Sequence, residues 1–215
     1  MYVEHSEIPG KAYFFGLATN LAVGCFNGGF VLGGMTDVGD ILAVQLNYLD
    51  DKDFYNTVIS AIAVFGMMVG SVFSKPILQI GRRRSILFSN IGITLATIPN
   101  FWTSNFAVLC TSRFFLGVCS AVIVNATSSY IGETTPTEYM TFVGTTINTG
   151  LVSGIFITYL FGLLLPDTST VAGLLAAQTD NLWRVSFSLQ LGSVLITTLA
   201  WLLVFKNEPV KFLIG

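Results

Sequence analysis

The sequence predicts an all-α membrane protein, a single domain of six membrane-spanning helices over residues 1–215. Three observations support this fold class. Apolar residues make up 53% of the chain and charged residues only 10%, whereas soluble domains carry about 25% charged residues. The apolar residues form runs long enough for a helix to cross a hydrocarbon core about 30 Å thick. The charged residues gather between these runs.

Charged residues mark the limits of the first three spans. The run at 12–35 follows Lys11, the run at 54–74 ends before Lys75, and the run at 85–102 follows the arginine triplet 82–84. A charged side chain at the bilayer centre costs at least ~3 kcal/mol on insertion scales, so the triplet is expected at a membrane surface. Even the shortest of the six runs reaches about 27 Å at 1.5 Å per residue.

The last three spans are predicted at 106–131, 141–165 and 183–205. The fourth ends before Glu133, the fifth ends before Asp167, and the sixth ends before Lys206. The longer connections, 36–53 and 167–182, are then on one side of the membrane and the arginine triplet is on the other.

Basic residues predict how the spans are oriented. An even number of spans puts both chain ends on the same side as the arginine triplet and the connection between spans 4 and 5. Short cytoplasmic loops collect Lys and Arg. Both termini are therefore expected in the cytoplasm, or on the matrix side of a mitochondrial membrane. The residues on that side are seven of the ten basic residues: Lys11, Lys75, Arg82, Arg83, Arg84, Lys206 and Lys211.

Several functions are not expected from this sequence. The odd number of cysteines, Cys25, Cys110 and Cys119, and the single His5 form no metal-ligand pattern, so neither a metal nor another cofactor is predicted. No catalytic triad, glycine-rich phosphate loop or carboxylate pair occurs in the polar connections, so the chain is not predicted to be an enzyme. No basic run is long enough to indicate nucleic acid.

Glycines inside the spans indicate a tightly packed bundle. Gly66 and Gly70 in span 2, and Gly150 and Gly154 in span 5, have the spacing of small residues that lets two helix backbones approach closely. In a bilayer, where the hydrophobic effect gives helices little reason to associate, such contacts supply the packing energy.

Polar residues inside the spans have two interpretations. Asn27, Asn125 and Asn148 lie in spans 1, 4 and 5, and Thr145 lies one turn before Asn148. Polar groups that faced lipid would be costly, so these side chains are expected to face other helices or water. Hydrogen bonding between helices is one reading. The other is binding of a neutral polyhydroxy solute, because a carboxamide both donates and accepts hydrogen bonds.

Motifs of one transporter family occur in order along nearly the whole chain. They match an aromatic-Asn-x-Gly element, a Gly-Arg-Arg turn, Arg-xxx-Gly, Tyr-xx-Glu-xx-Pro, and a loose version of Glu-Ser-Pro-Arg-x-Leu. With these the chain resembles the amino-terminal half of a sugar porter of the major facilitator superfamily. In sequence order the matching segments are Phe26–Gly29, Gly81–Arg84, Arg113–Gly117, Tyr130–Pro136 and Asn207–Leu213.

The resemblance implies a six-helix bundle with a 3+3 inverted repeat, and it suggests two sites. Asn148 stands at the position of a family Gln that contacts sugar. Arg82, Arg83, Arg113 and Glu133 match charged residues of the family's gating motifs. In the family, the charges at the inner loops close the cytoplasmic side by pairing with the other half of the carrier.

This sequence also departs from the family pattern. Leu78 and Gln79 replace an Asp and a basic residue before the arginine turn, and Met140-Thr141 replaces an Arg-Gly pair. The inner charge network is therefore incomplete. Proton-coupled relatives have Asp at the position of Asn27, near the Arg matched by Arg113, and a carboxamide does not titrate. This difference favours facilitated diffusion over proton symport.

Two functions follow as hypotheses. The chain is expected to be one half of a hexose-type carrier, working with a second half because alternating access is the rocking of one half against the other. That second half would be supplied by the rest of a longer protein, another chain or a second copy. The alternative is a transporter-derived subunit that no longer transports and serves as a helix bundle in a larger membrane complex. The bilayer is the partner common to both.

Overall fold

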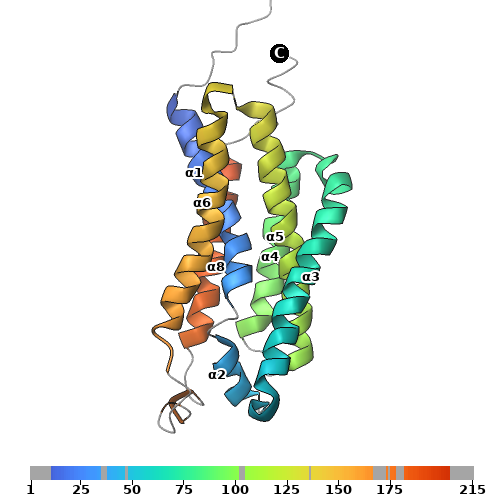
Figure 1. Cartoon of the computed structure of the whole chain (residues 1–215). Helices are drawn as coiled ribbons and strands as arrows, with labels where there is room; N and C mark the ends of the chain where they lie inside the picture. Colours follow the sequence, from blue (N-terminus) through green and yellow to red (C-terminus); the bar gives the residue numbers. More distant parts are fainter. Residues whose placement is uncertain are drawn as a thin grey trace, which may run out of the picture.

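The protein is described from a computed structural model over residues 11–34, 38–46, 48–101, 105–135, 137–166, 173, 175–177 and 182–203. Its long helices form an up-and-down bundle (Figure 1). The two ends of the chain, residues 1–10 and 204–215, lie outside the described residues. They include residues 204–205 of the last predicted span and the Asn207–Leu213 motif. The long helices are α1 Lys11–Gly33, α3 Lys52–Leu78, α4 Arg82–Thr97, α5 Phe106–Thr134, α6 Thr137–Gly162 and α8 Leu182–Leu203.

Every predicted span overlaps one of these helices, but the span criteria of length and hydropathy select five of them. In the described ranges α1, α3, α5, α6 and α8 are long and apolar enough to cross a membrane. The exception is α4, which has 16 residues and begins with three arginines. The short 3-10 helix η2, Ile98–Phe101, continues directly from its end.

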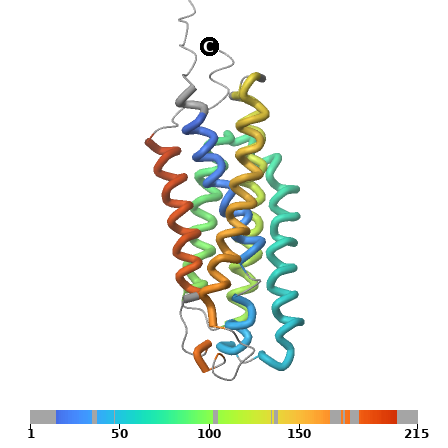
Figure 2. Tube along the Cα trace, turned by 60° about the vertical axis from the view of Figure 1, so that its left-hand side comes forward, coloured from blue at the N-terminus to red at the C-terminus, as the bar shows by residue number. Residues whose placement is uncertain are grey.

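Helices that follow one another along the chain alternate in direction (Figures 1 and 2). The start of α1, the turn from α3 to α4, the connection from α5 to α6 and the end of α8 lie at one end of the bundle. We call this the arginine end, because it holds the turn Gly81–Arg84. Gly81 has a φ of 128°, a conformation that favours glycine, so α3 reverses into α4 within a few residues.

A short helix, α2 (Val38–Gln45), lies at the opposite end of the bundle, followed by the 3-10 turn η1, Leu49–Asp51. The sequence predicted only a polar connection here. Val38, Ile41 and Leu42 are buried with Phe30 and Trp183 in one apolar cluster, so α2 belongs to the packed core. Gln45 also joins α2 to segments that are distant in the sequence. Its Nε2 donates to the Ala177 carbonyl at 3.0 Å, and its Oε1 accepts from Trp183 Nε1 at 3.1 Å.

Glycines bring the helices together in two pairs, α3 with α5 and α1 with α6. A Cβ on Gly66 or Gly70 would strike the backbone of α5, at the carbonyls of Phe114 and Val118. Gly150 and Gly154 face α1 in the same way, at the carbonyls of Ala22 and Phe26. The predicted close packing at both glycine pairs is confirmed.

Outside these pairs, α4 packs on α5, and α8 packs on α1 (Figure 2). Polar side chains join them. Asn90 of α4 donates through Nδ2 to the hydroxyls of Thr197 and Thr198 on α8, at 3.2 and 3.0 Å. Ser112 of α5 donates to the Ala96 carbonyl at 2.6 Å. Because lipid cannot satisfy such groups, these bonds help fix which helices are neighbours.

Candidate functional site

Two of the predicted solute-binding residues lie exposed on α6. Asn148 and Thr145 are both on the surface, while Gly150 and Gly154 of the same helix are buried against α1. Thr145 Oγ1 donates to the Thr141 carbonyl at 2.8 Å, which leaves the hydroxyl oxygen free to accept. The Asn148 side chain can offer both its amide donors and its carbonyl oxygen to a bound molecule.

Asn125 on α5 is half-buried and linked to α3. Its Nδ2 donates to Ser74 Oγ at 3.0 Å. Ser128, one turn further along α5, is exposed, and its own hydroxyl donates to the Val124 carbonyl at 2.9 Å. Asn125 therefore joins two helices and also borders the exposed part of α5.

Asn27 lies inside the bundle, with no exposed surface. Its Oδ1 accepts from Ser193 Oγ of α8 at 3.0 Å, and its Nδ2 lies 3.5 Å from the Gly24 carbonyl of its own helix. Asn27 thus has the helix-linking geometry that was the first reading of these carboxamides. Asn27, Asn125 and Asn148 point to different neighbours, and no hydrogen bond among the described residues joins them.

The sequence analysis missed the polar face of α8 that bonds to Asn27. Four polar residues spaced by four, three and four positions form a buried stripe along α8: Ser186, Gln190, Ser193 and Thr197. This spacing is that of one helical face, so the same pattern search that found polar residues in spans 1, 4 and 5 would have found it. Gln190 is 1% exposed, and neither of its amide atoms has a hydrogen-bond partner in the described structure.

An ion pair holds the arginine end together. Arg82 Nη2 lies 2.5 Å from Glu133 Oε1 near the end of α5, and Arg82 Nη1 donates to the Leu78 carbonyl at 3.3 Å. Both side chains are about three-quarters covered, at 30% and 26% exposure. Partial burial shields the pair from water, so its attraction exceeds that of a fully exposed pair.

Arg83 binds a different helix. Its Nε and Nη2 both donate to the Trp201 carbonyl in the last turns of α8, at 3.3 and 2.9 Å. The last carbonyls of a helix lack intrahelical partners, and a cation placed there also compensates the helix dipole. Adjacent arginines on α4 therefore fasten α5 and α8 separately.

Arg113 lies far from that pair. It is 20 residues before Glu133 on α5, which is about 30 Å along a helix. The side chain is 1% exposed, and its Nη1 and Nη2 donate to the carbonyls of Val31 and Gly34, at 3.3 and 3.4 Å. Its guanidinium carbon lies 5.8 Å from the ring centre of Phe187 on α8. Arg113 thus binds the carboxyl end of α1.

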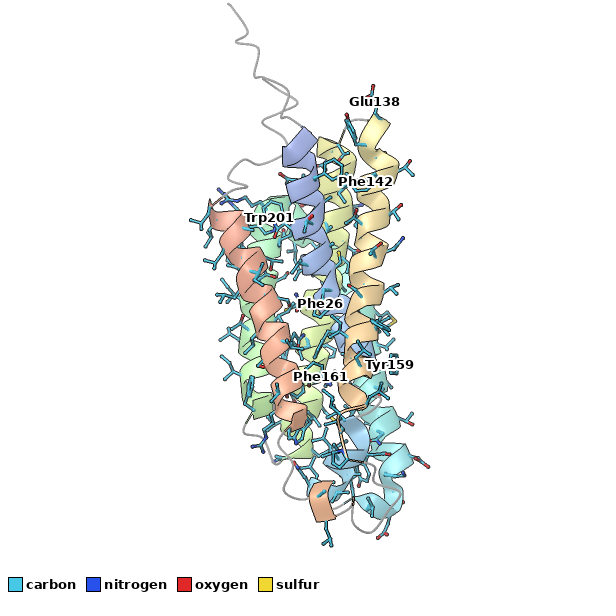
Figure 3. All side chains as sticks on the ribbon, turned by 90° about the vertical axis from the view of Figure 1, so that its left-hand side faces the viewer. Phe26, Glu138, Phe142, Tyr159, Phe161 and Trp201 are labelled. Carbon is cyan, nitrogen blue, oxygen red and sulfur yellow. The ribbon has the colours of Figure 1, made fainter. Side chains whose placement is uncertain are left out.

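Two grooves run between the spans. One, of about 430 Å³, lies among α1, α6 and α8 and includes Phe26, Thr149 and Ser193. Figure 3 shows Phe26 between α8 and α6 on this side of the bundle. The other groove, of about 500 Å³, lies between α4 and α5 and includes Gly92, Leu95 and Phe115. Apolar side chains predominate in both.

The Arg82–Glu133 pair is expected to contribute measurably to stability. In a double-mutant cycle of Arg82→Gln and Glu133→Gln, we expect a coupling energy of about 1 kcal/mol, because the pair is short and partly buried. Thermal unfolding in detergent measures it, since about 1 kcal/mol shifts Tm by roughly 2–4 °C at this chain length.

The matched control is the exposed pair of Lys52 Nζ and Asp40 Oδ2, 3.6 Å apart, tested with Lys52→Gln and Asp40→Asn. Its coupling energy is expected near zero, because both side chains are more than 40% exposed. Equal coupling in the two cycles would contradict a special contribution of the arginine end.

Comparison with known proteins identifies the family. The model of the family "Sugar (and other) transporter" matches residues 17–214. A facilitated glucose transporter of Gallus gallus, solute carrier family 2 member 1, is 32% identical over 163 residues, covering 72% of this chain and 30% of the transporter. Hexose transporter 1 of Toxoplasma gondii is 24% identical over 232 residues, covering 97% of this chain and 41% of that protein.

A solved structure shares the fold. The crystal structure of a D-xylose–proton symporter matches with a TM-score of 0.77 at 14% identity, covering 94% of this chain and 50% of the symporter. The chain thus spans half or less of the length of these relatives. Members of the family are multi-pass membrane transporters rather than enzymes. By the family match over residues 17–214, and with a helix bundle like that of the symporter, this chain belongs to the sugar transporter family of the major facilitator superfamily.

Proposed function

We propose that the chain acts as one six-helix half of a facilitative carrier for a hexose-like solute and works with a second half. The observation on which this rests most is Asn148, a carboxamide exposed on α6, a helix long and apolar enough to cross a membrane. A lipid-facing carboxamide would be costly, so this surface is better explained by contact with water, solute or a second half.

Open and polar positions on α5 and α6 also support a solute path. Gly132 of α5 and Gly144 of α6 each have open space where a side chain would stand, because no atom outside the local helix backbone lies within 4 Å of an added Cβ. Ser128 of α5 and Thr145 of α6 are exposed. Hydroxyl and amide groups without charge suit a neutral polyhydroxy molecule, because both sides can donate and accept.

The contacts between helices are consistent with a 3+3 inverted repeat, α1–α3–α4 against α5–α6–α8. Gly66 of α3 meets the Phe114 carbonyl of α5, and three residues further Gly117 meets the Ala63 carbonyl. The second contact repeats this spacing: Gly154 of α6 meets the Phe26 carbonyl of α1, and Gly29 meets the Leu151 carbonyl. Since α1 and α5 run in opposite directions, the two units would be inverted.

Facilitated diffusion is proposed because Asn27, which is buried in α1, stands at the position where proton-coupled relatives have Asp. Its carboxamide accepts from Ser193 at 3.0 Å and does not titrate, so it cannot take up and release a proton as a carboxylate does. The arginine end is proposed to face the cytoplasm, because basic residues collect on the cytoplasmic side of a membrane. The turn with Arg82, Arg83 and Arg84 lies at the same end of the bundle as the start of α1 and the end of α8, so both would face that side too.

The alternative, a structural subunit without transport, also has support. Arg83, Arg113 and Asn27 all make contacts within this half, with Trp201, Val31 and Ser193 respectively. Side chains engaged in this way stabilise the bundle whether or not a solute crosses it. Both functions remain compatible with a partner on the exposed face of α6.

The test is hexose uptake by proteoliposomes made with the chain and whatever second half co-purifies with it. Asn148→Ala is expected to lower uptake roughly tenfold, the effect of losing one hydrogen bond of about 1.5 kcal/mol. Asn148→Gln, which keeps the carboxamide, is the matched control and is expected to retain most of the uptake. Uptake that is absent in all three proteins, with an intact complex, would favour the structural subunit.

A further inference from the structure

We propose that the lipid-facing side of α4 is a binding site for an anionic phospholipid, with Arg84 contacting the phosphate and an apolar stripe below it contacting one acyl chain. The inference requires only that the bundle lies in a bilayer, as in its family. It goes beyond transport and does not depend on the solute, on a second half or on which side of the membrane the arginine end faces.

Arg84 differs from the two arginines beside it. Arg82 is paired with Glu133, and Arg83 donates to the Trp201 carbonyl. Arg84 is exposed, and no hydrogen bond or ion pair is found for it in the described part of the chain. One full positive charge is therefore directed away from the bundle at the membrane surface.

An apolar stripe runs from Arg84 into the membrane. Phe88, Ile91 and Leu95 follow it at intervals of four, three and four residues, which places all of them on one face of α4. They are 62%, 54% and 65% exposed, whereas Ile93 on the opposite face is fully buried. A bilayer covers such a face with hydrocarbon, so the stripe faces acyl chains.

The length of the stripe matches one leaflet. From Arg84 to Leu95 is 11 residues, about 16 Å along a helix. Half of a hydrocarbon core about 30 Å thick is about 15 Å. A lipid whose phosphate meets Arg84 would thus have its chain end near Leu95.

A groove begins at that depth. Gly92 and Leu95 of α4, with Phe115 and Cys119 of α5, form its upper part, and the whole groove holds about 500 Å³. Gly92 lies close to α5, since a Cβ there would be 2.5 Å from Cys119 Sγ. The groove offers a recess for the end of the acyl chain.

Charge selects the headgroup. A single exposed guanidinium attracts a lipid with net negative charge more than a zwitterionic lipid, by about 1 kcal/mol per basic side chain near the surface. We therefore assign the site to an anionic glycerophospholipid, with phosphatidylglycerol as the probe.

The experiment uses the chain reconstituted in nanodiscs with a photoreactive phosphatidylglycerol that carries a diazirine at the end of one acyl chain. Crosslinked peptides are read by mass spectrometry, and phosphatidylcholine with the same chain is the comparison lipid. We expect phosphatidylglycerol to label residues 88–96 of α4 and 115–119 of α5 about fivefold more than phosphatidylcholine, the ratio that corresponds to ~1 kcal/mol.

Variants separate this site from general attraction to basic residues. Arg84→Gln is expected to abolish the fivefold preference, Arg84→Lys to retain it, and Lys75→Gln, an exposed basic residue of α3 at the same end, to leave it unchanged. The proposal is overturned if both lipids label α4 equally, if Lys75→Gln acts like Arg84→Gln, or if labelling is spread evenly over α3, α6 and α8.

Discussion

Replacing Gly154 with leucine is expected to prevent assembly of the bundle. In the α1–α6 contact a Cβ on Gly154 would lie well inside van der Waals contact with the Phe26 carbonyl and close to Phe30 N. These are backbone atoms of a helix, so they cannot turn aside as a side chain would. Leucine adds three further carbons, and α6 would have to separate from α1 along its length.

The smaller substitution gives a measurable effect. Gly154→Ala is expected to lower stability by about 3 kcal/mol, the upper part of the range for overpacking, and hence Tm by roughly 6–12 °C. Size-exclusion chromatography and thermal unfolding in detergent would follow both variants. Gly154→Leu is expected to yield aggregated rather than monodisperse protein.

Gly144 is the matched control, because it lies on α6 and no other atom lies within 4 Å of an added Cβ. Gly144→Ala should leave Tm unchanged or raise it slightly, since alanine favours helix more than glycine by about 1 kcal/mol. Equal effects at the two positions would show that general helix propensity, rather than the contact with α1, sets the cost.

The large features of the fold could be predicted because each has a local signal. Apolar runs gave the positions of the long helices, and the spacing of Gly66 with Gly70 and of Gly150 with Gly154 gave the close contacts. Both signals come from the bilayer, which forces backbone groups to bond within a helix and leaves packing to small residues.

Features that depend on tertiary neighbours could not be predicted in this way. Helix α2 was missed because its eight residues carry no span-length apolar run, and its burial depends on Phe30 and Trp183 from distant segments. The end of α3 was misplaced because the predicted span stopped before Lys75, whereas the helix continues through Lys75 and Pro76 to Leu78. A single sequence shows a proline but not whether the helix around it continues.

The candidate sites show the same limit. The polar residues of the spans were identified, but only the structure separates Asn148, which is exposed, from Asn27, which bonds to Ser193. Likewise Arg82, Arg83 and Arg84 are identical letters in a row, and they face Glu133, Trp201 and the surroundings of the bundle. Successive side chains of a helix point in directions 100° apart, so the three arginines face different neighbours. Residue spacing sets this rotation, but it does not tell which helices stand in each direction.

Arg113→Lys is expected to destabilise the protein more than Arg113→Met, although lysine keeps the charge. The guanidinium spans two acceptors, the carbonyls of Val31 and Gly34, from one buried position. Val31 lies in the last turn of α1, and Gly34 lies just beyond that helix, so these carbonyls depend on a donor from outside α1. An ammonium cannot reproduce the planar fork that reaches both.

The two substitutions are expected to lower stability for different reasons. With lysine, a buried cation remains while at least one carbonyl loses its partner, and we expect a loss of about 3 kcal/mol, or roughly 6–12 °C in Tm. With methionine, both carbonyls lose a partner, but no charge has to be kept out of water, so a loss of about half that size is expected. Thermal unfolding of the two purified variants in the same detergent shows which of them is less stable.

The opposite order would have a specific meaning. If Arg113→Lys melts close to the unchanged protein while Arg113→Met does not, the charge itself is required, and the bonds to the end of α1 are secondary. Some negative group would then have to lie against Arg113 in the working protein. If instead the fork decides stability, the position serves to hold α1 on α5, and the cation is a consequence of needing two donors from one side chain.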